Sequence, residues 1–487
     1  MNSRTILAGI VLLALAVRLY HVTFPVAGFA AWRQADTAAM AKNFYENGFD
    51  ISRPQIDWGG NSAGYVETEF PLYSYLISLL YAAFAPDDMW GRLLSVVFSL
   101  GAVAALYLLV KKNLGEFTAC SAAIVYAVLP LNIFYARAIM PESMMLMCSI
   151  LGVYFFSEWV DRGRVTAFFM SAGCIACAAL LKLTALYLGV PLLFLAWQKY
   201  GATFLRRPIL WVYSALVLIP VVFWYYHAHQ LFHESGLSFG IWDYGTGKWG
   251  NFSPLLTFKF YNDVFFKSIA ERHLTYPGFM LFVIGLFIRR QRTEEKLFDW
   301  WLVGVLVFFA IVTRGNQVHE YYQLPFTIPA VIFIAKTLNK FLSPGNIGSY
   351  WRTRRPAFIA IALCTALVPV LGFMRYQNYM SGERLDGSIF ELGNAVRQAT
   401  ESGALVVAVD ESDPVVLYRC GRRGWHASPD QLTDSLLIQR QKEGARYLVG
   451  TMDFFDSDER KARLQALIRK LSAVAEEPNY FIIRLDR

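Results

Sequence analysis

Long apolar segments, separated by short polar or basic stretches, recur along most of this chain. A membrane-spanning helix needs about 20 mostly apolar residues, and about 11 segments approach that length. The predicted spans are residues 5–24, 92–110, 117–134, 142–158, 165–182, 184–199, 209–227, 276–290, 297–313, 322–340 and 357–375. The pattern therefore predicts an α-helical polytopic membrane protein.

A further segment, 71–86, is apolar but short, and it is followed by Asp87 and Asp88. Suppose that this segment does not span and that the N-terminus is cytoplasmic. Every basic cluster between spans then falls on the cytoplasmic side, as the positive-inside bias requires. If the segment does span, nearly all of these clusters move outside. We therefore interpret 71–86 as a juxtamembrane or re-entrant helix.

This topology places two long loops outside the membrane, 24–91 with its juxtamembrane helices and 228–275. Residues 1–375 form the predicted transmembrane domain, with the first span retained rather than cleaved as a signal peptide. Residues 376–487 follow the last span and contain the short apolar runs ALVVAVD, PVVLY, ARYLVGT and NYFIIRL, with helical stretches at 388–400 and 457–474. We interpret the runs as strands and the tail as a small extracytoplasmic α/β domain.

Composition agrees with a membrane protein. The chain of 487 residues is 56% hydrophobic and 17% charged, whereas soluble proteins carry about 25% charged residues. The net charge of +8 lies mainly in clusters between spans, which argues against nucleic-acid binding. Cys174 and Cys177 form a C-x-x-C, but within an apolar helix, so the six cysteines predict no disulfide framework and no metal site.

The first external loop carries six acidic residues. Asp36 lies in WRQADTAAMAKNFYENG, which is plausible as an amphipathic helix on the membrane surface. Arg33 precedes Asp36 by three residues, so on a helix the two could pair. The alternative is a surface helix with an ordinary exposed salt bridge.

Other charged residues gather at the external ends of the predicted spans. Glu67 and Glu69 come just before the segment at 71–86, and Arg137 and Glu142 flank the turn between two spans. Such residues are often interfacial anchors. Because they converge on one face from separate segments, they favour a polar cavity at the external boundary.

Possible phosphate ligands lie at the same boundary. His319, Tyr321 and Tyr322 occur together in RGNQVHEYYQLPFTIP, Arg272 ends the loop before the next span, and Lys182 ends another. Cationic side chains and hydroxyls are good donors for a lipid-linked phosphate. The alternative is an aromatic belt with a structural histidine.

Taken in order, WRQADTAAMAKNFYENG, TEFPLYSYL, LPLNIFYARAIMPE, LLKLTAL and NQVHEYYQLPFTIP resemble the polytopic GT-C glycosyltransferases of the protein-mannosyltransferase and lipid A aminoarabinose-transferase type. The resemblance covers about residues 1–375. It implies an undecaprenyl- or other polyprenyl-phosphate sugar donor and an acidic base in the first external loop. Aminoarabinose transferases carry a lysine where Phe70 follows Glu69 here, so the contacts to phosphate are expected to differ.

The resemblance also implies roles for individual residues. Asp36 is implied as the base and Glu142 as a second acidic residue at the site. The donor phosphate would be held by Arg272, His319, Tyr322, Lys182 and Arg137. The remaining cavity residues would be Arg33, Glu67, Glu69 and Tyr321.

The implied reaction is a single displacement with inversion, on the periplasmic side of a bacterial inner membrane. The acceptor could be lipid A, a cell-surface glycan or a protein. No cofactor is expected, and a divalent ion between Asp36 and Glu142 has no support from ligand spacing. Two alternatives remain: a transporter or flippase of lipid-linked sugars, and a non-enzymatic envelope assembly protein.

Overall fold

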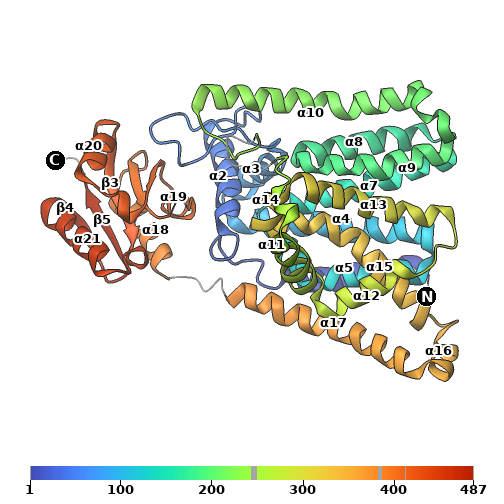
Figure 1. Cartoon of the computed structure of the whole chain (residues 1–487). Coiled ribbons are helices and arrows are strands. Elements are labelled where there is room, and N and C mark those ends of the chain that lie inside the picture. Colours follow the sequence, from blue (N-terminus) through green and yellow to red (C-terminus); the bar gives the residue numbers. More distant parts are fainter. Residues whose placement is uncertain (1, 243–248, 382–386, 412, 486–487) are drawn as a thin grey trace. The chain divides into compact units, whose positions relative to one another are not determined.

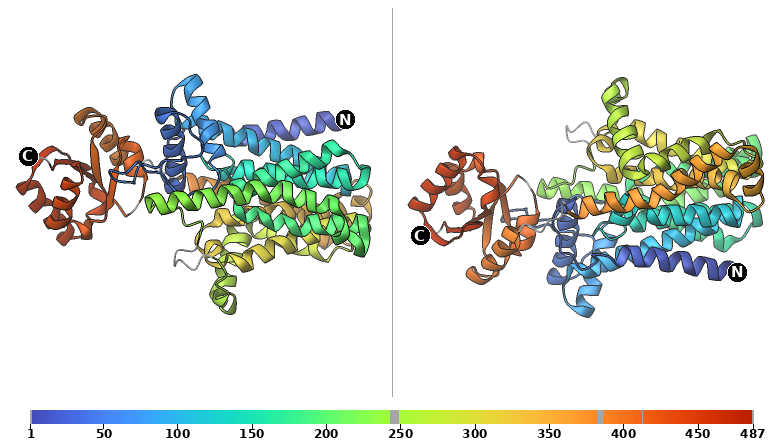
Figure 2. Two further views of the ribbon diagram at one scale, coloured as in Figure 1. Left: turned by 90° about the horizontal axis from the view of Figure 1, so that it is seen from above. Right: turned by 90° about the horizontal axis from the view of Figure 1, so that it is seen from below.

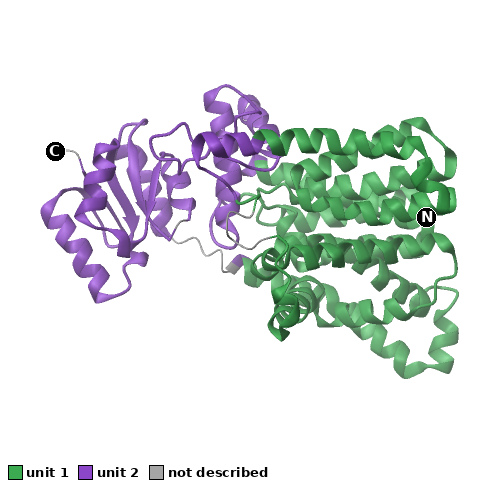
Figure 3. Cartoon of the chain, turned by 45° about the horizontal axis from the view of Figure 1, so that its top comes forward, with its two compact units in different colours: residues 1–23, 91–227, 240–379 green, residues 24–90, 228–239, 380–487 purple. Residues whose placement is uncertain are grey.

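The computed structural model describes residues 2–242, 249–381, 387–411 and 413–485. The chain divides into two compact units (Figure 3). Unit 1 comprises residues 1–23, 91–227 and 240–379, and unit 2 comprises 24–90, 228–239 and 380–487. Residues 243–248 of the predicted loop 228–275, and 382–386 of the predicted tail domain, lie outside the described residues.

Unit 1 consists of helices, and Figures 1 and 2 show its long helices running side by side. The helices that lie in it wholly or mainly are α1 (Ser3–Leu19), α4 (Asp88–Leu114), α5 (Glu116–Val128), α6 (Pro130–Tyr135), α7 (Glu142–Arg162), α8 (Val165–Leu181), α9 (Gly189–Tyr200), α10 (Pro208–Ser235), α11 (Phe258–Tyr261), α12 (Thr275–Phe287), α13 (Lys296–Ile311), α14 (Thr313–Val318), α15 (Leu324–Leu342), α16 (Ile347–Thr353) and α17 (Arg355–Ser381). Short helical turns and a π-helix connect them: η1 (Leu183–Leu188), η2 (Gly201–Arg206), η3 (Ser253–Leu256), η4 (Asn262–His273), η5 (Thr293–Glu295) and η6 (Glu320–Gln323). Every predicted span contains one of these helices.

Length and composition qualify four of the described helices to cross a membrane by themselves: α4, α7, α10 and α17. A fifth candidate is the pair Glu320–Leu342 and Ile347–Thr353, which is bent by 71°. The helices α5, α8 and α12 are apolar but shorter. The polytopic helical fold is thus confirmed, while the number of spans stays a prediction.

Two helices of unit 1 expose long apolar surfaces. On α10, Val222 and Phe223 are 65% and 74% exposed, and on α17 Leu363 and Met374 are 59% and 58% exposed. A soluble protein rarely leaves so much contiguous apolar surface in water. These surfaces are suited to contact with lipid.

In unit 2 the predicted first external loop folds around two helices, α2 (Ala31–Asn47) and α3 (Leu72–Phe84). The Ser74 hydroxyl on α3 donates to the Thr37 carbonyl on α2 at 3.0 Å. With 13 residues, α3 is about 20 Å long, whereas the hydrocarbon core is about 30 Å thick. This length suits the juxtamembrane interpretation of segment 71–86.

The C-terminal part of unit 2 is a five-stranded sheet with strand order β2-β1-β3-β5-β4. The strands β1, β2 and β3 are parallel, and β5 runs antiparallel to both β3 and β4. Its elements are α18 (Gly387–Ala399), β1 (Leu405–Val409), α19 (Val415–Cys420), β2 (Gly424–Ala427), η7 (Pro429–Gln431), α20 (Asp434–Lys442), β3 (Ala445–Thr451), η8 (Met452–Phe454), α21 (Asp458–Lys470), β4 (Ser472–Glu476) and β5 (Tyr480–Arg484). The predicted small α/β domain is confirmed.

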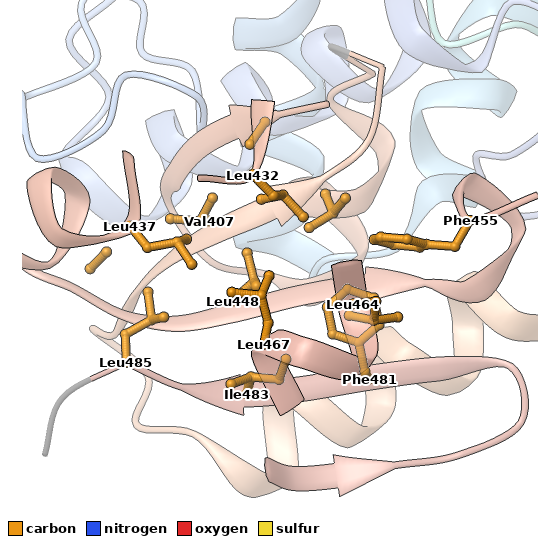
Figure 4. Packing of buried hydrophobic residues seen from close by; sticks show 13 residues of the cluster. Val407, Leu432, Leu437, Leu448, Phe455, Leu464, Leu467, Phe481, Ile483 and Leu485 are labelled. Carbon is orange, nitrogen blue, oxygen red and sulfur yellow. The ribbon is translucent and has the colours of Figure 1, made fainter. Parts of the chain in front are cut away.

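Both faces of this sheet are covered by helices. Successive side chains of a strand point to opposite faces, so Val407 packs with residues of α20 and α21 (Figure 4). Its neighbours Val406 and Ala408 pack instead with residues of α18 and α19. Burial on both sides explains why β1 is an unbroken apolar run.

One of the predicted strands is wrong. The run PVVLY forms helix α19 rather than a strand. Its valines favour a strand, but Pro414 precedes the first helical turn and the Asp413 carboxylate accepts the Val415 N–H at 3.0 Å. Such local capping starts a helix and outweighs the propensity of the two valines.

Candidate functional site

Asp36 lies in the middle of α2, and its side chain is buried, with only 3% of the residue exposed. The Trp58 indole N–H donates to the Asp36 carboxylate at 3.0 Å. Burial raises the pKa of Asp36 to about 7, against the opposing effects of Arg33, Trp58 and His426. A carboxyl with a pKa near neutrality is suited to accept and release a proton at physiological pH.

Other segments of unit 2 bury the helix α2, while its place at the membrane surface stays a prediction. All residues from Ala31 to Phe44 except Trp32 and Lys42 are buried, because α3, the loop after α2 and α19 all pack against this helix. Gly48 ends the helix in the left-handed conformation (φ 109°), and its N–H bonds to the Phe44 carbonyl. This glycine C-cap allows the chain to turn back over α2.

Arg33 forms its ion pair with Glu69 rather than with Asp36. The Nη2 to Oε2 distance is 2.6 Å, and the two side chains are 6% and 15% exposed. The guanidinium also lies over the Phe239 ring, 4.5 Å from its centroid. Because Arg33 is engaged in this way, it acts on Asp36 only through space, and it lowers the pKa of that carboxyl less than burial raises it.

Glu67 is fully buried in the same unit. Its carboxylate accepts a hydrogen bond from the Ser238 hydroxyl and lies 3.6 Å from His229 Nδ1. The Glu67 backbone also bonds to Leu237 and Phe239. Glu67 therefore fastens residues 237–239 to the first external loop, and this segment brings Phe239 to Arg33.

A second group of predicted residues meets in unit 1. Lys182 follows the last residue of α8, and its Nζ lies 3.0 Å from the Glu142 carboxylate. The same ammonium lies over the rings of Tyr321 and Tyr322, at 5.2 and 5.8 Å from their centroids. Glu142 is the first residue of α7, where the helix dipole favours a negative charge.

These four side chains line a small cavity together with Met145, Thr184 and Pro325. Its volume of about 10 Å³ is close to what a single water molecule needs. A buried ion pair is costly to break by removing one partner, since the other charge is then left without compensation. The ion pair between Glu142 and Lys182 therefore holds the start of α7 close to the end of α8 in unit 1.

His319 and Arg272 extend this group. The His319 ring stacks on Tyr321 and Tyr322, with centroids 5.1 and 6.1 Å away. Arg272 is 45% exposed and lies 3.9 Å from the Glu320 carboxylate, a long ion pair. An exposed guanidinium with so loose a partner can turn toward a phosphate.

Arg137 differs from the other predicted phosphate ligands. It is fully buried, its Nε donates to the Tyr376 hydroxyl at 3.0 Å, and its Nη1 donates to the His21 carbonyl at 3.4 Å. The guanidinium thus ties α17 to the segment after α1. This is the environment of a residue that holds helices together.

Sequence reasoning missed two contacts around Asp36. Trp58 supplies the indole donor, and Asp57 beside it is buried and accepts from Asn43 at 3.1 Å. Burial also raises the pKa of Asp57. A tryptophan between an aspartate and two glycines in a polar loop was the available signal.

No His, Cys, Asp or Glu group of three or more within the described ranges is placed to hold a metal ion.

Comparison with known proteins supports the resemblance seen in the sequence. Residues 68–227 match the family described as dolichyl-phosphate-mannose-protein mannosyltransferase. None of the curated proteins compared with this chain matches it.

Three solved structures share the fold. ArnT from Cupriavidus metallidurans in the apo state aligns with a TM-score of 0.67 at 15% identity, over 98% of each chain. Its complex with undecaprenyl phosphate aligns with a TM-score of 0.66, at the same identity and coverage. The archaeal oligosaccharyltransferase AglB from Archaeoglobus fulgidus, in complex with an inhibitory peptide and a dolichol-phosphate, gives 0.61 at 12% identity, over 93% of this chain and 69% of that one. The chain therefore has the GT-C, ArnT-like fold of a multi-pass membrane protein.

Proposed function

We propose that this protein is an inverting glycosyltransferase that moves a sugar from a polyprenyl-phosphate donor to an acceptor at the outer face of a bacterial inner membrane. The acceptor is lipid A, a cell-surface glycan or a protein. The observation that carries the proposal is Asp36, a buried carboxyl with a pKa of about 7 in the first external loop of a GT-C fold. The ArnT structure bound to undecaprenyl phosphate supports the choice of donor class.

In the proposed reaction Asp36 takes the proton of the acceptor hydroxyl or amine. The oxygen or nitrogen of the acceptor forms a bond to the anomeric carbon as the bond from that carbon to the phosphate oxygen breaks. Polyprenyl phosphate leaves with the electron pair of the broken bond, and one displacement inverts the configuration. No covalent sugar–enzyme intermediate is needed.

The residues around Asp36 have supporting roles in this proposal. The Trp58 indole orients the carboxylate through its hydrogen bond. Glu69 neutralises Arg33, so the guanidinium does not drive the pKa of Asp36 down to that of an ordinary ion-paired aspartate. A base with a strongly lowered pKa would accept a proton poorly at neutral pH.

Unit 1 supplies the donor-binding side chains in this proposal. Arg272, His319 and Tyr322 contribute an exposed guanidinium, a stacked imidazole and a phenol. Lys182 adds positive charge, while Glu142 holds that ammonium in place. These groups stabilise the charge that develops on the departing phosphate. We assign Arg137 to packing, because its donors bind Tyr376 and His21.

The function is tested with purified protein in detergent and a panel of synthetic polyprenyl-phosphate sugars. Release of free polyprenyl phosphate together with a glycosylated acceptor is the expected result. Detergent removes the two compartments that a flippase needs, so turnover there separates a transferase from a transporter. Donor binding without any product, across all sugars and acceptor classes in the panel, contradicts the proposal.

Substitution of Arg272 tests the donor side. Arg272→Ala is expected to raise the KM for the donor at least tenfold while the acceptor KM stays constant, because a charged hydrogen bond to phosphate contributes about 1.5–3 kcal/mol. Lys267→Ala is the matched control, since Lys267 is an exposed cation of the same helix η4 that pairs with Asp263. If only the acceptor KM changes, Arg272 does not bind the donor phosphate and this assignment is wrong.

A further inference from the structure

The C-terminal domain holds a histidine–carboxylate pair at the carboxyl end of two parallel strands. Asp410 directly follows β1 and is fully buried, and His426 lies in the neighbouring strand β2. The His426 Nδ1 lies 2.9 and 3.0 Å from the two Asp410 carboxylate oxygens. A buried carboxylate in this position fixes the orientation of the ring.

The loop after α2 is fastened to strand β2 within unit 2. The Gly424 N–H donates to the Asp57 carbonyl at 2.9 Å, and the Gly60 N–H donates to the Gly424 carbonyl at 2.8 Å. Gly60 has a φ of +64°, and a Cβ added there would come within 2.4 Å of the Trp425 indole nitrogen. So close an approach requires glycine.

Trp58 lies in this loop and contacts both Asp36 and the His426 ring. Its indole N–H donates to Asp36, and its rings lie 6.4 Å from the His426 ring between centroids. Trp58 also packs against the sheet core that contains Ala408, the residue paired with His426 in the strand register. The C-terminal domain therefore brings an ionisable ring next to the residue that orients Asp36.

The charges that face this pair come from several elements. Arg33 on α2 and Asp57 in the loop act on Asp36, together with His426. Asp410 and Asp413 at the end of β1 act on His426. Burial is the largest cause of the raised pKa of Asp413. Within unit 2, Arg33 and His426 are the cationic groups among the main influences on Asp36.

We propose that His426, oriented by Asp410, is a positioning residue for Asp36. When it is protonated, the ring carries a positive charge that opposes the effect of burial on the Asp36 carboxyl across Trp58, so Asp36 serves as a base over a correspondingly lower pH range. The C-terminal domain is then a working part of the active site. This inference rests on the proposed transferase function and deepens it.

The test is the pH dependence of kcat for the full-length protein with a polyprenyl-phosphate sugar. The acidic limb of the wild-type profile is expected near pH 7. His426→Gln keeps a hydrogen bond to Asp410 but removes a group that lowers the pKa of Asp36 through space, so the limb is expected to move to higher pH. The rate at pH 6.5 then falls severalfold and recovers above pH 8, while the donor KM is unchanged.

Two further variants complete the test. Asp410→Asn removes the carboxylate that fixes the His426 ring, so the limb is expected to move in the same direction, and this variant carries the test if His426→Gln does not fold. Asp434→Asn is the matched control, because Asp434 is an exposed residue of α20 that pairs with Lys470. The Asp434→Asn variant is expected to show the acidic limb at the same pH as the wild type.

The outcomes separate the two proposals. Wild-type transfer with an unshifted limb in His426→Gln and Asp410→Asn overturns this inference and leaves the transferase function standing. A uniform loss of rate without a shift does the same, since it indicates a purely structural role. Absence of transfer by the wild type overturns the function and this inference with it.

Discussion

At the residue scale, the buried Asp36 carboxyl lowers the stability of the folded state at neutral pH. Its carboxyl is buried and has a pKa of about 7, well above the value of an exposed aspartate. Between about pH 4 and pH 7 the folded state holds a proton that the unfolded state has released. Its contribution to stability is therefore full below about pH 4 and is lost as the pH rises through 7.

The variant Asp36→Asn is expected to separate stability from activity. Because asparagine keeps an acceptor for the Trp58 indole and has no charge to bury, the variant gains up to about 4 kcal/mol over the wild type above pH 7. The difference shrinks toward zero near pH 4. Thermal unfolding in detergent at pH 4 and pH 8 measures it, and a variant less stable than the wild type at pH 8 contradicts the assigned pKa.

The residues around Asp36 show which parts of the candidate site could be predicted from the sequence. The motif that contains Asp36 pointed to a helix and to this aspartate. The partners of Asp36 could not be predicted, because Trp58 and His426 lie 22 and 390 positions further along the chain. Only the folded loop and sheet bring them to α2. The Arg33 pair was missed for the same reason, since Glu69 is a non-local partner.

At the element scale, the hydrophobic pattern was enough to locate the membrane helices. Each predicted span contains a helix because apolar periodicity over many residues is a strong signal. Strands without an apolar run were missed: β2 is GWHA, and β4 (SAVAE) is largely exposed and begins inside the predicted helical stretch 457–474. The helix α19 was mistaken for a strand because its capping residues outweigh two valines.

The ion pair that joins α7 to α8 offers an element-scale prediction. Lys182→Met leaves the buried Glu142 carboxylate without its partner and is expected to cost about 3–5 kcal/mol of stability. The double variant Glu142→Gln/Lys182→Met removes both charges and recovers most of that loss. Sugar transfer is not recovered. Thermal unfolding and activity of the wild type, of Glu142→Gln, of Lys182→Met and of the double variant measure this, and additive losses of stability would contradict a direct pair.

At the scale of the whole molecule, unit 2 is built from three distant stretches of the chain. Asp88 accepts from Arg419 at 2.9 Å and also binds the Tyr418 hydroxyl, so the first external loop is joined to α19. Residues 228–239 add Phe239 and Ser238 to the same unit. Unit 2, which contains the proposed base Asp36, is thus held together by contacts that cross more than 300 positions of sequence.

Membrane topology is a whole-molecule prediction. A cysteine-free variant with Thr203→Cys should react with a membrane-impermeant thiol reagent only after the inner membrane is opened. The same background with Ser253→Cys should react in intact spheroplasts, because the positive-inside bias places that loop outside. Both positions are exposed. The reverse pattern would mean that segment 71–86 crosses the membrane.

The central claim is that Asp36 is the base of a sugar transfer from a polyprenyl-phosphate donor. The most direct measurement compares single-turnover transfer by the wild type, Asp36→Asn and Asp50→Asn. Asp50 is an exposed acid of the same loop, and its carboxylate accepts hydrogen bonds from the Ser52 N–H and hydroxyl. We expect Asp36→Asn to bind donor normally and to lose at least 100-fold in rate, the usual scale of general-base catalysis (about 10²–10⁴). Asp50→Asn keeps the wild-type rate. Transfer by Asp36→Asn within tenfold of the wild type would contradict the claim.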